Sequence, residues 1–288
     1  MDFGNVLTAM VTPFDADENI DFEVTTTLIE HLIANGTEGI VVAGTTGESP
    51  TLSDDEKIAL FKHASKVVNK RIPVIAGTGN NNTRDSIALT KKAEACGVDA
   101  IMLVTPYYSR PNQQGLYEHF SAIAKETKLP IMLYNIPGRS VVNMTAETTI
   151  RLSKIKNIVS IKESSGDLDQ VSRIIENTSE DFSVYSGDDG MTLPLLSIGA
   201  HGVVSVASHI IGSQMNSIVT EFKKGNNTKA GSIHRESLST IKGLFKAPSP
   251  APVKAALIIR GIDVGGVRLP LVGLSDDEEL TLKALLEE

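Results

Sequence analysis

The segment VSIKESSG, residues 159–166, ends a short apolar run with a lysine and follows it with polar residues and glycine. Successive side chains of a strand point to opposite faces, so Ser160 and Lys162 share one face while Val159 and Ile161 share the other. The second face is wholly apolar and suits packing against a hydrophobic layer. The segment therefore predicts a buried β-strand that carries a lysine at its C-terminal end.

Seven similar β-branched runs occur along the chain, and each is followed by a segment whose apolar residues have helical spacing. The eight expected strands are residues 6–11, 39–43, 73–76, 100–104, 131–134, 158–162, 183–185 and 202–206. Eight βα units fit a closed (β/α)8 TIM barrel of the α/β class better than an open sheet. Active sites form at the C-terminal ends of barrel strands, so Lys162 is expected to point into that mouth. The alternative is a lysine that simply ends its strand and reaches solvent.

Helix boundary signals agree with this count. The sequence SDDE at 53–56 and again at 275–278 is a capping box, and Gly36 and Gly97 stand where helices should end. These signals place helix starts and stops between the expected strands.

The C-terminal part of the chain has a different pattern. Strand signals cease after about residue 225, and the remaining helical segments are residues 228–245, 252–261 and 275–288. We therefore expect a catalytic barrel over residues 1–224 and a C-terminal helical domain over residues 225–288.

The composition narrows the classes of partner. The 288 residues include 27 basic and 35 acidic side chains, and a net charge of -8 argues against nucleic acid or an anionic membrane as the main partner. The N-terminal sequence lacks the basic segment of a signal peptide, and no apolar run reaches the roughly 20 residues of a membrane helix. Cys96 is the only cysteine, which excludes an intrachain disulfide. We expect a cytoplasmic protein with a small-molecule partner.

The second expected strand ends in GTTGES, residues 44–49. Its glycines expose backbone N–H groups, and Thr45 and Thr46 add hydroxyl donors, so this turn could hold a carboxylate. The alternative is a plain Gly/Thr turn that precedes the helix cap at Ser53.

Two more strand ends carry candidate functional groups. The fifth ends in LYNIPGR, where Tyr134 faces the same side as Met132 and Arg139 could bind a carboxylate through two hydrogen bonds. The fourth ends in TPYY, where Tyr107 and Tyr108 suit an interface or a site better than a core. A core tyrosine and a solvated arginine remain alternatives for Tyr134 and Arg139.

Metal-dependent chemistry is not expected. The six histidines lack HExxH or similarly paired spacing, and Asp188 with Asp189 is more typical of a helix start than of a metal site. GTGNNN at residues 77–82 lacks the Lys-Ser/Thr of a phosphate-binding loop.

The motifs GTTGES, TPYY, YNIPGR and IKESSG, in that order, resemble the pyruvate-dependent Schiff-base aldolase family typified by N-acetylneuraminate lyase and dihydrodipicolinate synthase. The resemblance covers nearly the whole chain and extends to AGTGNN, SGDD, HGVVSV and PSPAPVKAAL. The arginine after YNIPG and the TPYY pair are similar to the synthase branch of the family.

The resemblance implies condensation of pyruvate with L-aspartate 4-semialdehyde, the first committed step towards diaminopimelate and lysine. By this matching, Lys162 forms an imine with pyruvate, and Thr45 and Thr46 hold the pyruvate carboxylate. Arg139 binds the carboxylate of the semialdehyde. An imine is itself an electron sink, so the reaction needs no metal and no cofactor.

The same matching gives further residues a role. Tyr134, Thr46 and Tyr108 resemble the family's proton relay, with Tyr108 reaching into the site of a neighbouring subunit. Gly187 and Val204 match positions that line the pyruvate pocket. The resemblance therefore implies a homo-oligomer, expected to be a tetramer built as two tight dimers.

Lysine-sensitive relatives bind free lysine at their tight dimer interface. The matching positions here are Ser49, Pro50, Asp54, Lys57, Asn81, Asp85 and Tyr107. Asp54 and Lys57 stand where those relatives tend to carry histidines, and Asp85 is shorter than their glutamate. We therefore expect free lysine to inhibit weakly or not at all.

Two other functions are compatible with parts of the pattern. One is an aldolase of the same family that acts on a sugar-derived 2-oxo acid, although such enzymes typically lack the arginine found at Arg139. The other is a barrel that binds a small acid and regulates a partner without catalysis. That function would be expected to lose Lys162 or Tyr134, and both are present.

Overall fold

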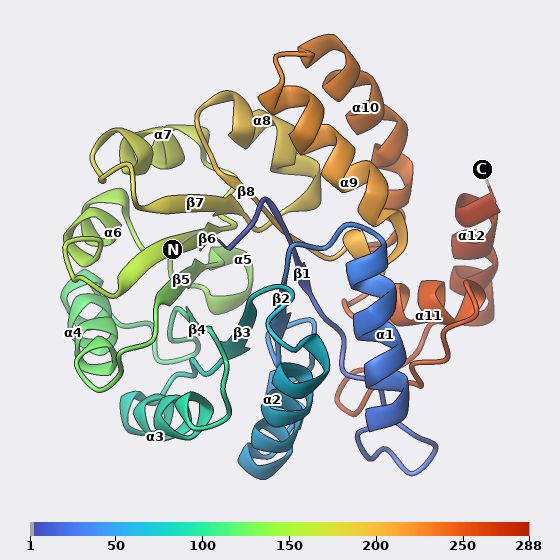
Figure 1. Ribbon diagram of the computed structural model, residues 1–288, viewed down its shortest axis with the longest axis horizontal. Coiled ribbons are helices and arrows are strands. Elements are labelled where there is room, and N and C mark those ends of the chain that lie inside the picture. The colour runs from blue at the N-terminus through green and yellow to red at the C-terminus, as the bar shows by residue number, and fades with distance from the viewer. Residues whose placement is uncertain (1–2, 288) are drawn as a thin grey trace.

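The computed structural model describes residues 3–287 and contains the predicted barrel. Eight parallel strands pair in sequence order, and β8 closes the barrel on β1 (Figure 1). The strands are β1 (Val6–Ala9), β2 (Gly39–Val42), β3 (Val74–Gly77), β4 (Ala100–Val104), β5 (Ile131–Asn135), β6 (Ile158–Glu163), β7 (Ser183–Ser186) and β8 (Gly202–Ser205). The eight predicted strands are confirmed, with ends that differ by at most two residues.

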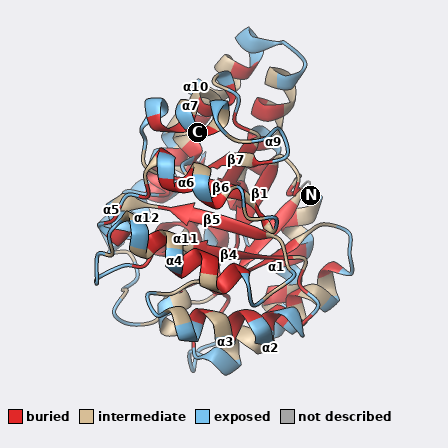
Figure 2. Cartoon of the chain, turned by 90° about the vertical axis from the view of Figure 1, so that its left-hand side faces the viewer, coloured by how far each residue is buried: buried red, intermediate tan, exposed pale blue. Residues whose placement is uncertain are grey.

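Helices surround the barrel and bury their inner faces against it (Figure 2). They are α1 (Phe22–Ala34), α2 (Asp54–Val68), α3 (Thr83–Glu94), α4 (Gln113–Ala124), α5 (Pro137–Ser140), α6 (Ala146–Leu152), α7 (Leu168–Glu176), α8 (Thr192–Ser197) and α9 (Ser208–Lys223), with short 3-10 turns η1 (Ser49–Thr51) and η2 (Asp189–Met191). Within residues 3–287, no helix is long and apolar enough to cross a membrane.

The predicted helix boundaries are confirmed. The hydroxyl of Ser53 accepts from the Glu56 N–H, and the Glu56 carboxylate accepts from the Ser53 N–H, so α2 starts with a complete capping box. Gly36 and Gly97 follow α1 and α3 with φ values of +92° and +80°, which glycine adopts without strain.

Three helices follow the barrel, namely α10 (Asn227–Gly243), α11 (Ala251–Ile259) and α12 (Asp276–Glu287). Helix α10 packs on α9, whereas α11 and α12 pack on each other on the side of α1 (Figure 1). The predicted division after residue 224 falls in the short loop between α9 and α10. Residues 1, 2 and 288, the outer ends of the two expected domains, lie outside the described residues.

His209 joins the strands at the seam where the barrel closes. Its Nδ1 donates to the carbonyl of Val206 after β8 at 2.8 Å, and its Nε2 accepts from the N–H of Val11 after β1 at 3.2 Å. This arrangement requires a neutral ring, because a backbone N–H can only donate. Burial lowers the pKa of His209 to about 4.

This histidine predicts a loss of stability on the acid side. The unfolded chain takes up a proton near the ordinary pKa of 6.5, whereas folded His209 stays neutral to about pH 4. The contribution of His209 to stability is therefore complete above pH 6.5 and is lost as the pH drops towards 4, by roughly 3 kcal/mol.

The test is the melting temperature as a function of pH. His209→Gln keeps one acceptor and one donor but does not titrate, so it should reduce the slope of the curve between pH 6.5 and 4, with His119 accounting for part of the slope that remains. A variant curve with the wild-type slope would contradict this role of His209.

Candidate active site

A cavity of about 220 Å³ opens at the C-terminal ends of β2 to β5. It lies at the mouth predicted from the strand order. Among the predicted site residues, those that line it are Thr45, Ser49, Pro50, Tyr107, Tyr134 and Arg139.

Lys162 and Tyr134 lie side by side on neighbouring strands. The register of β5 and β6 pairs these two residues, and Lys162 Nζ lies 4.2 Å from the centroid of the Tyr134 ring. Their side chains are buried, with only 4% and 3% of each residue exposed. No carboxylate within residues 3–287 forms an ion pair with Lys162. A buried amine beside a cavity can attack a carbonyl carbon, which is the first step of imine formation.

Gly187 provides the space for the stem of Lys162. A Cβ at this position would lie 2.9 Å from Lys162 Cε, 3.0 Å from its Cγ and 1.9 Å from Ser164 Oγ. Any side chain at 187 would therefore displace the lysine. The structure brings Gly187 against Lys162, whereas Val204 is buried in β8 opposite Leu7 of β1.

The GTTGES loop follows β2 at the edge of this cavity. Thr46 is buried, Thr45 is half-buried, and the carbonyl of Gly47 accepts from the hydroxyl of Thr12 at 2.7 Å. Thr12 lies just after β1, so this bond ties the loop to the neighbouring strand end. Arg139 lies across the cavity mouth on α5 and is exposed.

Tyr108 does not join the other relay candidates of its own chain. It is 91% exposed, and it occupies the centre of a three-residue turn closed by the Ser109 N–H to the Tyr107 carbonyl at 2.9 Å. Its φ of +70° is unfavourable for a tyrosine, and such strained turns are rare. The backbone therefore directs this ring away from the chain that carries it.

Glu163 is a site residue that the sequence analysis missed. Its carboxylate accepts from Asn135 Nδ2 at 3.1 Å, from the Ser165 N–H at 2.7 Å and from Gln170 Nε2 at 3.2 Å. Burial raises the pKa of Glu163, and these hydrogen bonds oppose the shift.

This carboxylate locks the two strands that carry the buried amine and its aromatic neighbour. Asn135 directly follows Tyr134, and Glu163 directly follows Lys162, so each bonded residue faces away from the cavity while its neighbour faces it. The acid after the lysine in IKES and the amide after the tyrosine in YN were the available sequence signals. Their pairing depends on the register of β5 and β6.

Asp189 has a similar role after β7. Asp188 caps η2, in agreement with the prediction that the pair begins a helix. Asp189 itself is fully buried and accepts from the N–H groups of Val206 at 3.0 Å and Ala207 at 3.1 Å, and from the Ser205 hydroxyl. Burial raises the pKa of Asp189. It therefore fixes the loop that follows β8.

Within residues 3–287, no three His, Cys, Asp or Glu side chains gather as a metal site would require. The polar groups at the mouth are instead one amine, one guanidinium, hydroxyl groups and backbone N–H groups. These can bind carboxylates and form an imine.

The model of the Dihydrodipicolinate synthetase family matches residues 2–288. The chain belongs to this family. It is 61% identical to the 4-hydroxy-tetrahydrodipicolinate synthase of Bacillus subtilis (strain 168) over 289 residues, with 100% of both proteins covered. The family resemblance read from the motifs is confirmed.

Solved structures of dihydrodipicolinate synthases have the same fold. The enzyme from Bacillus anthracis is 56% identical with a TM-score of 0.99, covering 100% of this chain and 99% of that one. The enzyme from Cyanidioschyzon merolae, solved with lysine bound, is 46% identical with a TM-score of 0.97, covering 99% and 97%. These likenesses extend across the barrel and the C-terminal helices of this dihydrodipicolinate synthetase family member.

Proposed function

We propose that this chain condenses pyruvate with L-aspartate 4-semialdehyde to give 4-hydroxy-tetrahydrodipicolinate through an imine on Lys162. The observation that carries the proposal is the buried amine of Lys162 against the ring of Tyr134, which lines the same cavity as Thr45 and Arg139. The names of close relatives support the same reaction.

The proposed chemistry uses the side chains at the mouth. Lys162 Nζ attacks the ketone carbon of pyruvate, and water leaves as the imine forms. The imine draws electrons from the methyl group, which loses a proton and becomes the carbon nucleophile that attacks the aldehyde. Tyr134 and Thr46 carry protons with Tyr108, while Thr45 and Thr46 bind the pyruvate carboxylate. The amino group of the semialdehyde then displaces Lys162 and closes the ring.

Arg139 distinguishes this reaction from a sugar-acid aldolase in the same family. Its exposed guanidinium stands at the rim of the cavity, where a second carboxylate would enter. A purely regulatory barrel has no use for the buried Lys162 amine. Gly187 and Val204 complete the proposed pocket through backbone and shape.

The proposal also covers organisation and location. Catalysis is assigned to the barrel, residues 1–224, with residues 225–288 as a C-terminal helical domain. The imine on Lys162 serves as the electron sink, so no metal takes part in the proposed steps. The proposed compartment is the cytoplasm.

We expect borohydride with pyruvate to trap a covalent adduct on Lys162, located by peptide mass mapping. Lys162→Ala should abolish the adduct. Arg139→Ala should keep the adduct but raise the KM for the semialdehyde by roughly 10- to 100-fold, since a charge-assisted bidentate contact is lost.

The two variants separate the parts of this proposal. A trapped peptide without Lys162 would refute the imine mechanism. Unchanged semialdehyde kinetics in Arg139→Ala would remove the support for this second substrate while leaving the imine intact.

The exposed, strained turn at Tyr108 supports a site shared between subunits, and the proposed assembly is a tetramer of two tight dimers. Inactive Lys162→Ala chains mixed with inactive Tyr108→Phe chains should then regain activity. A hybrid dimer holds one site with both wild-type groups, so we expect up to about a quarter of wild-type activity per mixed sample.

The readout is initial rate after subunit exchange, with exchange demonstrated separately by mass labelling. Each variant alone under the same treatment is the control. Exchange without any gain in rate would count against a shared relay.

The positions matched to the lysine effector site are divided between the cavity and the surface. Ser49, Pro50 and Tyr107 line the cavity, while Asn81 and Asp85 are exposed. The side chain of Asp54 is half-exposed, with Lys92 Nζ 3.9 Å away.

Lys57 is half-buried at this surface instead of extending into solvent. Burial lowers the pKa of Lys57, and the charges of Asp54 and Glu56 oppose that shift. A second ammonium close to the effector's own would repel it by about 4 kcal/mol at 4 Å and an effective dielectric near 20. Salt screening reduces this, yet even 1–2 kcal/mol weakens binding roughly 5- to 30-fold.

We therefore expect free lysine to inhibit weakly or not at all. The measurement is initial rate against lysine concentration at subsaturating pyruvate. Lys57→His should move the curve towards sensitivity, because it removes the permanent charge. Clear inhibition of the wild type at low millimolar lysine would overturn this expectation.

A further inference from the structure

The GTTGES loop ends at a buried carboxylate in a strained backbone conformation. Glu48 has a φ of +57°, which is unfavourable for any residue other than glycine and persists only where the surroundings hold it. Its side chain is fully buried. A buried charge also requires a partner.

Both partners of the Glu48 carboxylate come from the C-terminal segment of the chain. Lys254 on α11 forms an ion pair between Nζ and Glu48 Oε1 at 2.9 Å, with 2% and 0% of the two side chains exposed. The backbone N–H of Arg268 donates to Oε2 at 2.9 Å. Within residues 3–287, no hydrogen bond reaches Oε1, and the ammonium of Lys254 is the one cation that forms an ion pair with Glu48. Removal of this ammonium therefore leaves a buried, uncompensated charge.

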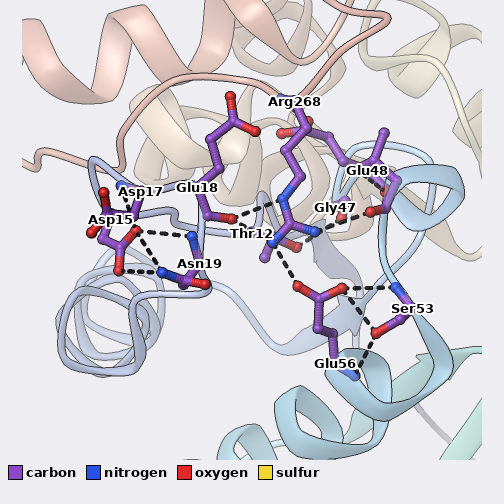
Figure 3. A network of polar contacts seen from close by, with 11 residues as sticks. Thr12, Asp15, Asp17, Glu18, Asn19, Gly47, Glu48, Ser53, Glu56 and Arg268 are labelled. Carbon is purple, nitrogen blue, oxygen red and sulfur yellow. Dashed lines mark hydrogen bonds and ion pairs between the residues drawn. The ribbon is translucent and has the colours of Figure 1, made fainter.

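The Arg268 side chain holds the stretch between this loop and α2 (Figure 3). It donates to the Thr51 carbonyl at 3.0 Å, to the Glu18 carbonyl at 2.9 Å and to Glu56 Oε1 at 2.6 Å. The hydrogen bond from Arg268, together with those from Ser53 and against the effect of burial, lowers the pKa of Glu56 to about 2. Glu56 also belongs to the capping box with Ser53, so Arg268 fixes the start of α2 as well.

Phe14, just after β1, joins the same network. Lys254 Nζ lies 4.1 Å and Arg268 Cζ 4.3 Å from the centroid of its ring, in cation–π geometry. Its N–H donates to the carbonyl of Val264 at 3.0 Å. A Cβ at Gly265 would lie 2.0 Å from the carbonyl oxygen of Phe14. The C-terminal segment therefore approaches the loop after β1 as closely as a glycine allows.

We propose that Lys254 and Arg268 are positioning residues that hold the GTTGES loop in the conformation that binds the pyruvate carboxylate. Binding of pyruvate and docking of the C-terminal segment are thereby coupled through Glu48. The inference rests on the function proposed above, in which Thr45 and Thr46 bind that carboxylate. Convergent N–H and hydroxyl donors bind an anion best when they are ordered beforehand, because a loop that orders during binding loses affinity.

The test is pyruvate-dependent trapping on Lys162 by borohydride in the full-length protein. Lys254→Met keeps the length of the stem but leaves Glu48 buried without its counter-charge. We expect the half-saturating pyruvate concentration to rise roughly 10-fold, equivalent to about 1.4 kcal/mol. Trapping of acetaldehyde on the same lysine should stay unchanged, since this carbonyl compound has no carboxylate for the loop to hold.

Two further variants separate positioning from general damage. Glu48→Gln combined with Lys254→Met removes both charges, so the half-saturating pyruvate should return to within about 3-fold of wild type. Lys70→Met is the control, because it breaks an ion pair between Lys70 Nζ and Asp99 Oδ1, 2.8 Å apart, at the N-terminal end of β4. It should leave the trapping of pyruvate and of acetaldehyde unchanged.

If Lys254→Met does not fold, Arg268→Gln decides the question. It removes the guanidinium contacts without leaving a buried charge, and the expected rise in half-saturating pyruvate is about 3-fold, again with acetaldehyde unaffected. Three results would overturn the positioning role. They are a wild-type pyruvate dependence in these variants, an equal loss of trapping for both carbonyl compounds, and no recovery in the double variant. Absence of any adduct on wild-type Lys162 would instead refute the proposed function.

Discussion

The rest of the barrel mouth depends on one constraint, the burial of the Lys162 amine against the Tyr134 ring. An amine stem that crosses a packed barrel interior needs space, and the bare backbone of Gly187 supplies it. The aromatic neighbour needs a fixed strand register, which the pairing of β5 with β6 provides. The reactive group is therefore positioned by the rigid strands, whereas the groups around it come from loops.

Those loops are held by three buried carboxylates, each at or just after the C-terminal end of a strand. Glu48 follows β2, Glu163 ends β6 and Asp189 follows β7. Each accepts from backbone N–H or side-chain donors at the barrel mouth, where strand pairing has ended. Glu163 and Asp189 reach neighbouring elements only. Glu48 reaches across the chain, and its partner Arg268 is 220 residues away.

This difference explains how much could be predicted from the sequence. The strands, the capping boxes and the position of Lys162 depend on local periodicity and on the strand-end rule for barrels, so they were predicted. The partners of Glu163 depend on strand register, and the Glu48–Lys254 pair depends on how the C-terminal helices return to the barrel. Neither is encoded by spacing along the chain. Tyr108 was expected outside the core, both from its loop and from the family resemblance that places it in the site of a neighbouring subunit, whereas its strained turn was not predicted.

The Glu48–Lys254 pair is a poor device for stability alone. Removing two charges from water costs about as much as their attraction returns, and apolar side chains of similar volume can do as well. An apolar pair, however, has no directional requirement, whereas Glu48 must direct one oxygen to an ammonium and the other to a backbone N–H. That geometry selects a single arrangement of a loop whose own φ values at Ala43 and Glu48 are unfavourable. The C-terminal part of the chain thus fixes the orientation of the GTTGES loop, which strand pairing in the barrel does not fix.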